Sequence, residues 1–185
     1  MGSFIVLMRT IMHTTHQRKM DERWTGSQAM TPAEFRLQIA TLTLQLAGRP
    51  LDAALDTWLN AEVGPGTQTY TRLKAACQAG ASEGWLCNRE GGGIRYGRIF
   101  KAAEDLHGFS VDVVDMQDLV GPHHSHPNGE IDLLMPLEGD ALFDGRPAGW
   151  HLHPDEARLR VSVRRPGLGE SAGAGVAVVR SEERR

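Results

Sequence analysis

The sequence predicts an α+β fold in which a helical unit comes first and an antiparallel β domain follows. Two observations support this prediction. Apolar residues recur at three-to-four spacing through residues 31–80, which is the period of amphipathic helices. Through residues 84–150, short apolar runs alternate with turns rich in Gly, Pro, Asn and Asp, which is typical of a sandwich or small barrel. Because strands and helices do not alternate, a Rossmann-like sheet is not expected.

The first predicted helix begins at Thr31, whose hydroxyl can accept from the first-turn amides. Pro32 suits the first helical position and Glu34 can bond back to the cap. Gly48, Arg49 and Pro50 end this helix. Two further amphipathic helices are predicted over residues 51–59 and 67–79, separated by the Gly-Pro-Gly break at 64–66.

The two ends of the chain are expected to differ from its middle. Residues 1–30 are mostly polar with no sustained period, so we predict a poorly ordered extension. Residues 151–185 contain no Phe, Tyr or Trp and seven Arg, which favours an atypical, partly disordered tail. Apolar residues at 159–163 and 176–179 still predict two short strands there.

Composition limits the classes of protein that the chain can represent. The 185 residues carry a net charge of -3, whereas a general nucleic-acid binder is expected to be basic. No apolar run approaches the roughly 20 residues that cross a bilayer, so neither a nucleic-acid nor a membrane partner is predicted. Two cysteines form no disulfide framework and no secretory leader is recognised, so we expect a cytoplasmic protein.

Histidines gather in the β region, where five of the eight lie between positions 123 and 153. His124 and His126 share one face of a predicted strand, because side chains alternate. The Pro-Asn-Gly sequence at 127–129 favours a turn. Glu130 and Asp132 then share a face of the next strand. Such a hairpin would bring imidazoles and carboxylates together.

The chemistry of this cluster has two interpretations. His124, His126 and Glu130 are suitable ligands for Zn, Fe, Ni or Mn. The same three residues, with Asp132, are also suited to general acid–base catalysis. Asp132 could instead orient a histidine ring or serve as an ordinary strand carboxylate. His123 alternates to the opposite face, so we expect it to be structural or exposed.

Two resemblances sharpen this interpretation. The spacing of His124, His126 and Glu130 resembles the first metal-binding motif of the cupin superfamily. Residues 84–150 resemble the 4-hydroxylaminobenzoate lyase family of bacterial nitrobenzoate catabolism. The matching strings are GWLCNRE at 84–90, GGIRYGR at 92–98, FSVDVV at 109–114, GPHHSHPNGEIDLLMP at 121–136, and the FDG and GW pieces within 143–150.

The resemblance implies a cupin-like antiparallel β-barrel or sandwich after the helical unit. It implies a lyase that converts 4-hydroxylaminobenzoate to 3,4-dihydroxybenzoate (protocatechuate) with release of ammonium, in 4-nitrobenzoate degradation. A small aromatic acid would be the partner, a divalent metal ion is a candidate cofactor, no organic cofactor is expected, and a homodimer is expected by analogy. The alternatives are another metal-dependent cupin enzyme, such as a dioxygenase or isomerase, and a non-catalytic cupin that binds an aromatic acid.

If the family resemblance holds, the substrate is a benzoate and its carboxylate needs a cationic partner. Arginine binds carboxylates through two parallel hydrogen bonds. Arg89, Arg95 and Arg98 lie in the matching region and are the predicted binders. Trp150 is a candidate wall for a flat aromatic pocket.

The sequence departs from the family pattern in two places. Asp118 stands where the cupin motif expects glycine. After Trp150, the family's Pro-Gly-Ser turn and later histidine are missing. A shift of reading frame near Pro154 is one hypothesis for this departure. If the tail is genuine, His151 or His153 is a candidate further ligand.

Overall fold

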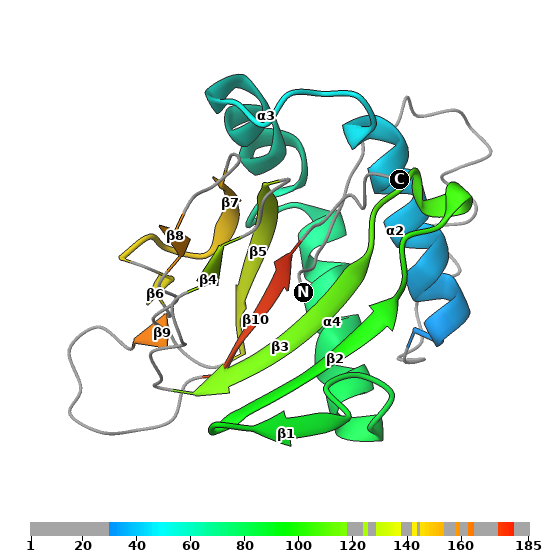
Figure 1. Cartoon of the computed structure of the whole chain (residues 1–185), viewed down its shortest axis with the longest axis vertical. Helices are drawn as coiled ribbons and strands as arrows, with labels where there is room; N and C mark the ends of the chain where they lie inside the picture. The colour runs from blue at the N-terminus through cyan, green and yellow to red at the C-terminus, as the bar shows by residue number, and fades with distance from the viewer. Residues whose placement is uncertain are drawn as a thin grey trace.

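The computed structural model has three α-helices and antiparallel sheets in the part of the chain that it describes (Figure 1). It describes residues 30–117, 124–125, 129–137, 142–143, 145–153, 158–159, 163–164 and 174–179. The helices are α2 (Pro32–Leu46), α3 (Ala53–Val63) and α4 (Gln68–Glu83), with a short 3-10 helix η1 (Glu104–Leu106). The predicted α+β class is confirmed.

A six-stranded antiparallel sheet dominates the β region. Its order is β1 (Arg89–Gly91), β2 (Ile94–Phe100), β3 (Val111–Gln117), β10 (Ala174–Val179), β5 (Glu130–Pro136) and β7 (Gly149–His153). Two small two-stranded sheets pair β4 (His124–Ser125) with β8 (Arg158–Leu159), and β6 (Leu142–Phe143) with β9 (Val163–Arg164). The described strands form open sheets rather than a closed barrel, because β1 and β7 lie at opposite edges.

Local sequence signals explain where the helices begin. The Thr31 hydroxyl accepts from the Glu34 amide at 3.3 Å, and the Glu34 carboxylate accepts from the Thr31 amide at 2.8 Å. This reciprocal arrangement is the predicted capping box. Asp52 caps α3 by accepting from the Leu55 amide at 2.9 Å. The helices α3 and α4 extend four residues beyond their predicted ends, to Val63 and to Glu83.

The hydrophobic core lies between the helices and one face of the sheet, which we call the helix-covered face. The sheet contributes Val113 from β3, Ile131 and Leu133 from β5, and Trp150 from β7, all at most 1% exposed. Burying such a side chain contributes roughly 1.5–3 kcal/mol. The sheet therefore has its apolar side fixed against α2, α3 and α4.

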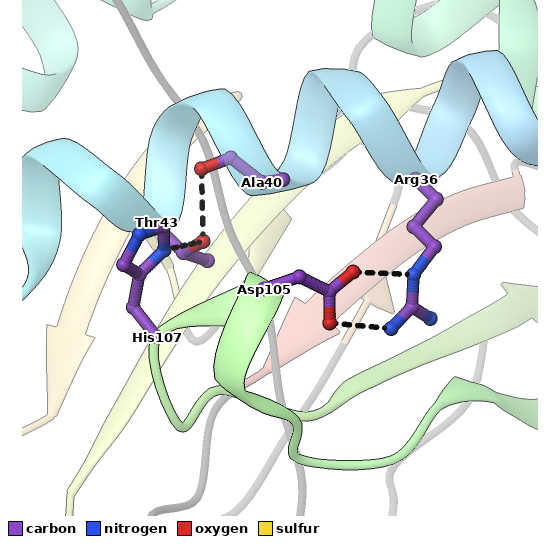
Figure 2. Close-up of polar contacts among 5 residues, drawn as sticks. All are labelled: Arg36, Ala40, Thr43, Asp105 and His107. Carbon is purple, nitrogen blue, oxygen red and sulfur yellow. Dashed lines mark hydrogen bonds and ion pairs between the residues drawn. The ribbon is translucent and has the colours of Figure 1, made fainter.

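Polar contacts also hold α2 to the segment around η1 (Figure 2). The Arg36 guanidinium donates two hydrogen bonds to Asp105, each 2.8 Å long. The Thr43 hydroxyl lies 3.0 Å from Nδ1 of His107 and donates to the Ala40 carbonyl at 3.2 Å. The hydrogen bond from Arg36 lowers the pKa of Asp105. Because this ion pair is exposed, it contributes at most about 1 kcal/mol.

The C-terminal region contributes strands to this fold. The strand β10 lies between β3 and β5, and Figure 1 shows it in red near the middle of the sheet. All six of its residues pair with β3, from Ala174 opposite Gln117 to Val179 opposite Asp112. Residues 1–29 of the extension predicted at 1–30 lie outside the described residues, and the domain boundaries remain predictions. Within the described residues, no helix is both long and apolar enough to cross a membrane.

Candidate functional site

Strand register places four ionisable side chains on one face of the sheet. Glu130 pairs with His153, and Asp132 pairs with His151. Directly opposed residues of antiparallel strands share a face. We call these four residues the polar quartet, and the side of the sheet that carries them the polar face. The intervening residues of β5 and β7 lie on the helix-covered face.

The two carboxyl groups of the quartet are deeply buried. Glu130 is 2% exposed and Asp132 is 1% exposed. An ionised carboxylate is costly to bury. Burial raises the pKa of Glu130, and the Asp132 charge and a hydrogen bond between the two carboxyl groups raise it further. Both effects favour the protonated, uncharged form of Glu130.

His153 links the carboxyl pair to a cation. Its Nε2 lies 3.2 Å from Oδ2 of Asp132 and 3.2 Å from Nη2 of Arg146. One nitrogen cannot donate to Asp132 and accept from Arg146 at the same time. The proton on His153 Nε2 therefore decides which of the two contacts is a hydrogen bond.

His151 is held in one tautomer. Its Nε2 lies 2.9 Å from the Pro147 carbonyl oxygen. A carbonyl only accepts, so Nε2 carries the hydrogen and Nδ1 carries the lone pair. Burial lowers the pKa of His151 to about 4, and nearby Arg146 and His153 oppose a further positive charge, although the Pro147 bond favours one. The ring is neutral at pH 7.

The predicted metal ligands are only partly described. The backbone of His124 lies in β4, opposite Leu159 of β8. The side chains of His124 and His126, and all of His123, lie outside the described part of the chain. Among the side chains that are described, no three of His, Cys, Asp or Glu are grouped to hold a metal ion. The ligand set of His124, His126 and Glu130 remains a prediction.

The predicted substrate-binding arginines separate onto different parts of the sheet. Arg95 lies on the helix-covered face, where it donates to the Ala81 carbonyl of α4 at 3.1 Å and pairs with Asp115 at 3.4 Å. Arg98 pairs in register with Asp112 and bonds to it at 3.0 Å. Because β3 alternates, Asp112 and Arg98 lie on the polar face.

The other two predicted substrate contacts are not beside the quartet. Arg89 lies exposed on the edge strand β1, opposite Tyr96. Trp150 is buried on the helix-covered face and its indole nitrogen donates to the Val63 carbonyl at 3.0 Å. The structure thus brings Glu130 and Asp132 together and places Trp150 on the opposite side of the sheet.

Sequence reasoning gave no site role to Arg146 and considered His151 and His153 only as substitute ligands. A signal for the histidines was present. His151 and His153 follow Trp150 at alternating positions, as expected for a strand that continues from Gly149 to His153. No local pattern marks Arg146, because its contact with His153 depends on how the chain before β7 folds back.

Comparisons with known proteins agree with the resemblance seen in the sequence. A family model described as "PnbB: 4-hydroxylaminobenzoate lyase" matches residues 37–167. A 4-hydroxylaminobenzoate lyase of Nocardioides sp. (strain LMS-CY) is 35% identical over 111 residues, which are 57% of this chain and 65% of that protein. A 4-hydroxylaminobenzoate lyase of Pseudomonas putida is 31% identical over 112 residues, 54% of this chain and 63% of that protein. The matched part thus spans slightly less than two thirds of each relative.

Similarity to solved structures is weak. The EutQ protein of Clostridium difficile gives a TM-score of 0.32 at 17% identity, covering 48% of this chain and 68% of that one. An HTH_3 family transcriptional regulator from Vibrio cholerae gives 0.28 at 17% identity, covering 83% and 92%. Neither score supports an argument about function. The family match, by contrast, spans most of the chain and includes the whole polar quartet, so this chain belongs to the 4-hydroxylaminobenzoate lyase family.

Proposed function

We propose that this chain converts 4-hydroxylaminobenzoate, water and a proton into 3,4-dihydroxybenzoate and ammonium. Family membership and the names of the two relatives support the proposal. The observation that carries it is the buried carboxyl pair on the polar face, where Glu130 holds its proton because Asp132 lies beside it. A carboxylic acid that stays protonated at neutral pH is suited to proton donation.

The reaction needs such a donor because the N–O bond must break with both electrons leaving on oxygen. Hydroxide is a poor leaving group, whereas a protonated hydroxyl leaves as water. In our proposal Glu130 supplies that proton and Asp132 receives the hydrogen bond that positions it. His124 and His126 remain predicted donors or metal ligands near the same site. If a metal ion is bound there, it would supply Lewis-acid assistance to the leaving oxygen.

The remaining steps need water but no external oxidant or reductant. Loss of water leaves an electron-poor ring, and a second water adds to the carbon next to the one that bears nitrogen. A third water hydrolyses the resulting imine and expels ammonia, after which the ring regains aromaticity. One water leaves and two enter, so one water is consumed. The nitrogen is reduced and the ring carbon is oxidised within the same molecule.

Arg98 is our proposed partner for the substrate carboxylate. It lies on the polar face, as the quartet does, and β3 and β10 separate its strand from β5. Three strand spacings amount to about 14 Å. If the register of β10 against β5 continues beyond Val176, Val179, which is opposite Asp112, lies level with Asp132. A para-substituted benzoate lying across β3 and β10 would then reach from Arg98 to the carboxyl pair.

The test is an ammonium-release assay with purified protein and 4-hydroxylaminobenzoate. The substitution Glu130→Gln keeps the shape but removes the acidic proton, so we expect the rate to fall by about 100-fold or more. Glu104→Gln, an exposed carboxylate on η1, is the matched control and should keep the wild-type rate. The proposal fails if the wild-type protein releases no ammonium or if Glu130→Gln is as active as wild type.

Measurements of oxygen uptake and of ligand binding on the same protein and substrate separate the alternative functions. Oxygen uptake with an aromatic substrate would favour a dioxygenase, because the proposed reaction consumes none. Tight binding of an aromatic acid without turnover would favour a non-catalytic binding protein. Both outcomes would contradict the lyase proposal.

A further inference from the structure

We infer that a pocket between α2 and α4 is a second binding site of this chain, and that it takes a benzoic acid that carries a hydroxyl group. We call it the α2–α4 pocket. It has a volume of about 190 Å³ and is lined by Met30, Glu34, Leu37, Gln38 and Arg72. These residues belong to the helical layer, whereas the polar quartet lies on the side of the sheet that the helices do not cover. The inference therefore goes beyond the proposed reaction and does not rest on it.

The volume of the pocket suits a single aromatic ring. An apolar cavity of about 150 Å³ is large enough to bind benzene, so this slightly larger pocket has room for a ring with small substituents. Most of its lining is apolar, with Met30 and Leu37 as the apolar side chains. Leu37 is 69% exposed, and a ring placed against it would remove apolar surface from water. The body of the ligand is therefore expected to be one ring.

Gln38 supplies an acceptor for one substituent of that ring. Its amide oxygen is buried and has no hydrogen-bond partner among the described residues. A buried acceptor that lacks a partner costs free energy, and a donor that enters the pocket recovers it. A hydroxyl group on the ring is a donor of this kind. The free amide oxygen thus points to a ligand with a hydroxyl group.

Arg72 supplies a cation for a second substituent. Its guanidinium comes from α4 and has five N–H donors, so it can bind a carboxylate and keep other contacts as well. The negative group of the pocket, Glu34, is held elsewhere, because its Oε2 accepts from the Thr31 amide at 2.8 Å and from the Thr31 hydroxyl at 2.7 Å. The N-terminus of α2 also favours a negative charge there. A carboxylate at Arg72 and a hydroxyl group at Gln38 together define a hydroxybenzoate.

The test is a titration of the full chain with 4-hydroxybenzoate, followed by NMR of isotope-labelled methionine methyl groups. The signal of Met30, assigned with Met30→Leu, should move and then saturate, because the ring current of a bound aromatic ring acts on it. Met116 lies on the polar face of β3, two pairs along from Asp112. Its signal therefore reports acid bound near the quartet separately. Movement of the Met116 signal with no movement of Met30 would contradict the inference.

A series of ligands tests the two polar contacts. Benzoate lacks the hydroxyl donor and should bind about fivefold more weakly than 4-hydroxybenzoate. In Gln38→Met this difference should disappear, because the buried acceptor is gone. Phenol lacks the carboxylate and should bind about tenfold more weakly than 4-hydroxybenzoate. Equal binding of the three compounds would show that neither polar contact is made.

Leu37→Glu and Leu44→Glu form a matched pair of variants. Both leucines are exposed on α2, at 69% and 61%, and of the two only Leu37 lines the pocket. Leu37→Glu should weaken binding of 4-hydroxybenzoate about tenfold or more, because it removes an apolar contact and repels the carboxylate. Leu44→Glu should bind as wild type does. Thermal melts of both variants check folding, and equal weakening in the two would overturn the inference.

Other occupants of the pocket give different results, and each overturns the inference. Binding of 4-hydroxybenzoate only to a chain that begins at Met30 would mean that residues 1–29 compete for the pocket. A Met30 signal that moves with protein concentration, and not with added acid, would mean that a second copy of the chain fills it. Because no step uses ammonium release, failure of this inference and failure of the lyase proposal are distinguishable.

Discussion

At the scale of single residues, two buried groups on the polar face titrate away from their usual ranges in opposite directions. Burial and the neighbouring Asp132 raise the pKa of Glu130, whereas burial, Arg146 and His153 lower that of His151. Both shifts come from the low capacity of the interior to stabilise charge. A pKa that differs between the folded and the unfolded chain makes stability depend on pH. Each shift therefore predicts how the free energy of unfolding changes with pH.

His151 should destabilise the fold in acid. The pKa of His151 is about 4 in the folded protein against 6.5 for an ordinary histidine. Between these values the unfolded chain binds a proton that the folded chain does not, so stability is lost as pH falls. From pH 7 to pH 4.5 this loss is about 2 kcal/mol. Urea unfolding at both pH values measures this loss. In His151→Gln the fall in the free energy of unfolding should be smaller than in wild type by that amount, and an equal fall in both proteins would contradict the assignment.

Glu130 should have the opposite pH dependence. Its raised pKa means that the folded chain keeps a proton that the unfolded chain releases above about pH 4.5. The stability associated with this proton is full below that pH and declines as pH rises. We therefore expect Glu130→Gln to gain stability relative to wild type between pH 5 and pH 8, while it loses activity. Thermal melts of variant and wild type at both pH values test this. The prediction fails if the stability difference between the two proteins is the same at both pH values.

At the scale of secondary-structure elements, β7 is positioned by α3. Asn60 of α3 donates to the Trp150 carbonyl at 3.0 Å and accepts from the Trp150 amide at 2.9 Å. Gly149 allows this approach, since a Cβ there would lie 2.5 Å from Oδ1 of Asn60. Trp150 is held on one side of the strand, so His151 is directed to the other. A helix on one face thereby fixes a histidine on the opposite face.

Removing the two hydrogen bonds of Asn60 to β7 should weaken both the fold and the site. Asn60→Ala leaves the amide and carbonyl of a buried residue without these bonds, and each such group costs about 1–3 kcal/mol when it is left unsatisfied. Urea unfolding should show this loss, and the ammonium-release rate should fall because β7 is less well fixed. Thr57→Ala, on an exposed turn of α3, is the control and should change stability by less than about 0.5 kcal/mol. A stable and fully active Asn60→Ala would show that these two hydrogen bonds are not needed to position β7.

At the scale of the whole molecule, β10 joins two parts of the sheet. It pairs with β3 along its full length and with β5 through Gly175 and Val176. Without it, β3 and β5 would each present an unpaired edge in the interior of the sheet. The C-terminal region is therefore part of the framework that holds the quartet.

This role predicts the effect of truncation. A chain ending at residue 173 lacks β10 and should lose cooperative unfolding and ammonium release, because the sheet is interrupted between β3 and β5. A chain ending at residue 180 keeps β10 and should unfold like the full chain. Circular dichroism and urea unfolding compare the two. A cooperative, active chain ending at 173 would show that β10 does not join the sheet.

Much of the local structure could be predicted from the sequence. The capping box at Thr31 depends on residues three positions apart, and the shared face of Glu130 and Asp132 follows from the two-residue period of a strand. The helices α3 and α4 end later than predicted, because the residues that terminate them lie further along the chain. Gly80 sits inside α4 where Trp85 packs against it, and the helix ends only at Gly84, which takes the left-handed conformation.

The sequence by itself determined which side chains share a face of each strand, because alternation is a local property of the backbone. Only the tertiary structure decided which strands are neighbours. Pairing joins residues far apart in the chain, so it brought His151 and His153 to the carboxyl pair, and chain folding before β7 added Arg146. Alternation alone puts Arg95 and Arg98 on opposite faces of β2, and only the tertiary structure decided that the helices cover the face of Arg95. Contacts across many residues depend on packing of the whole core, which no short pattern encodes.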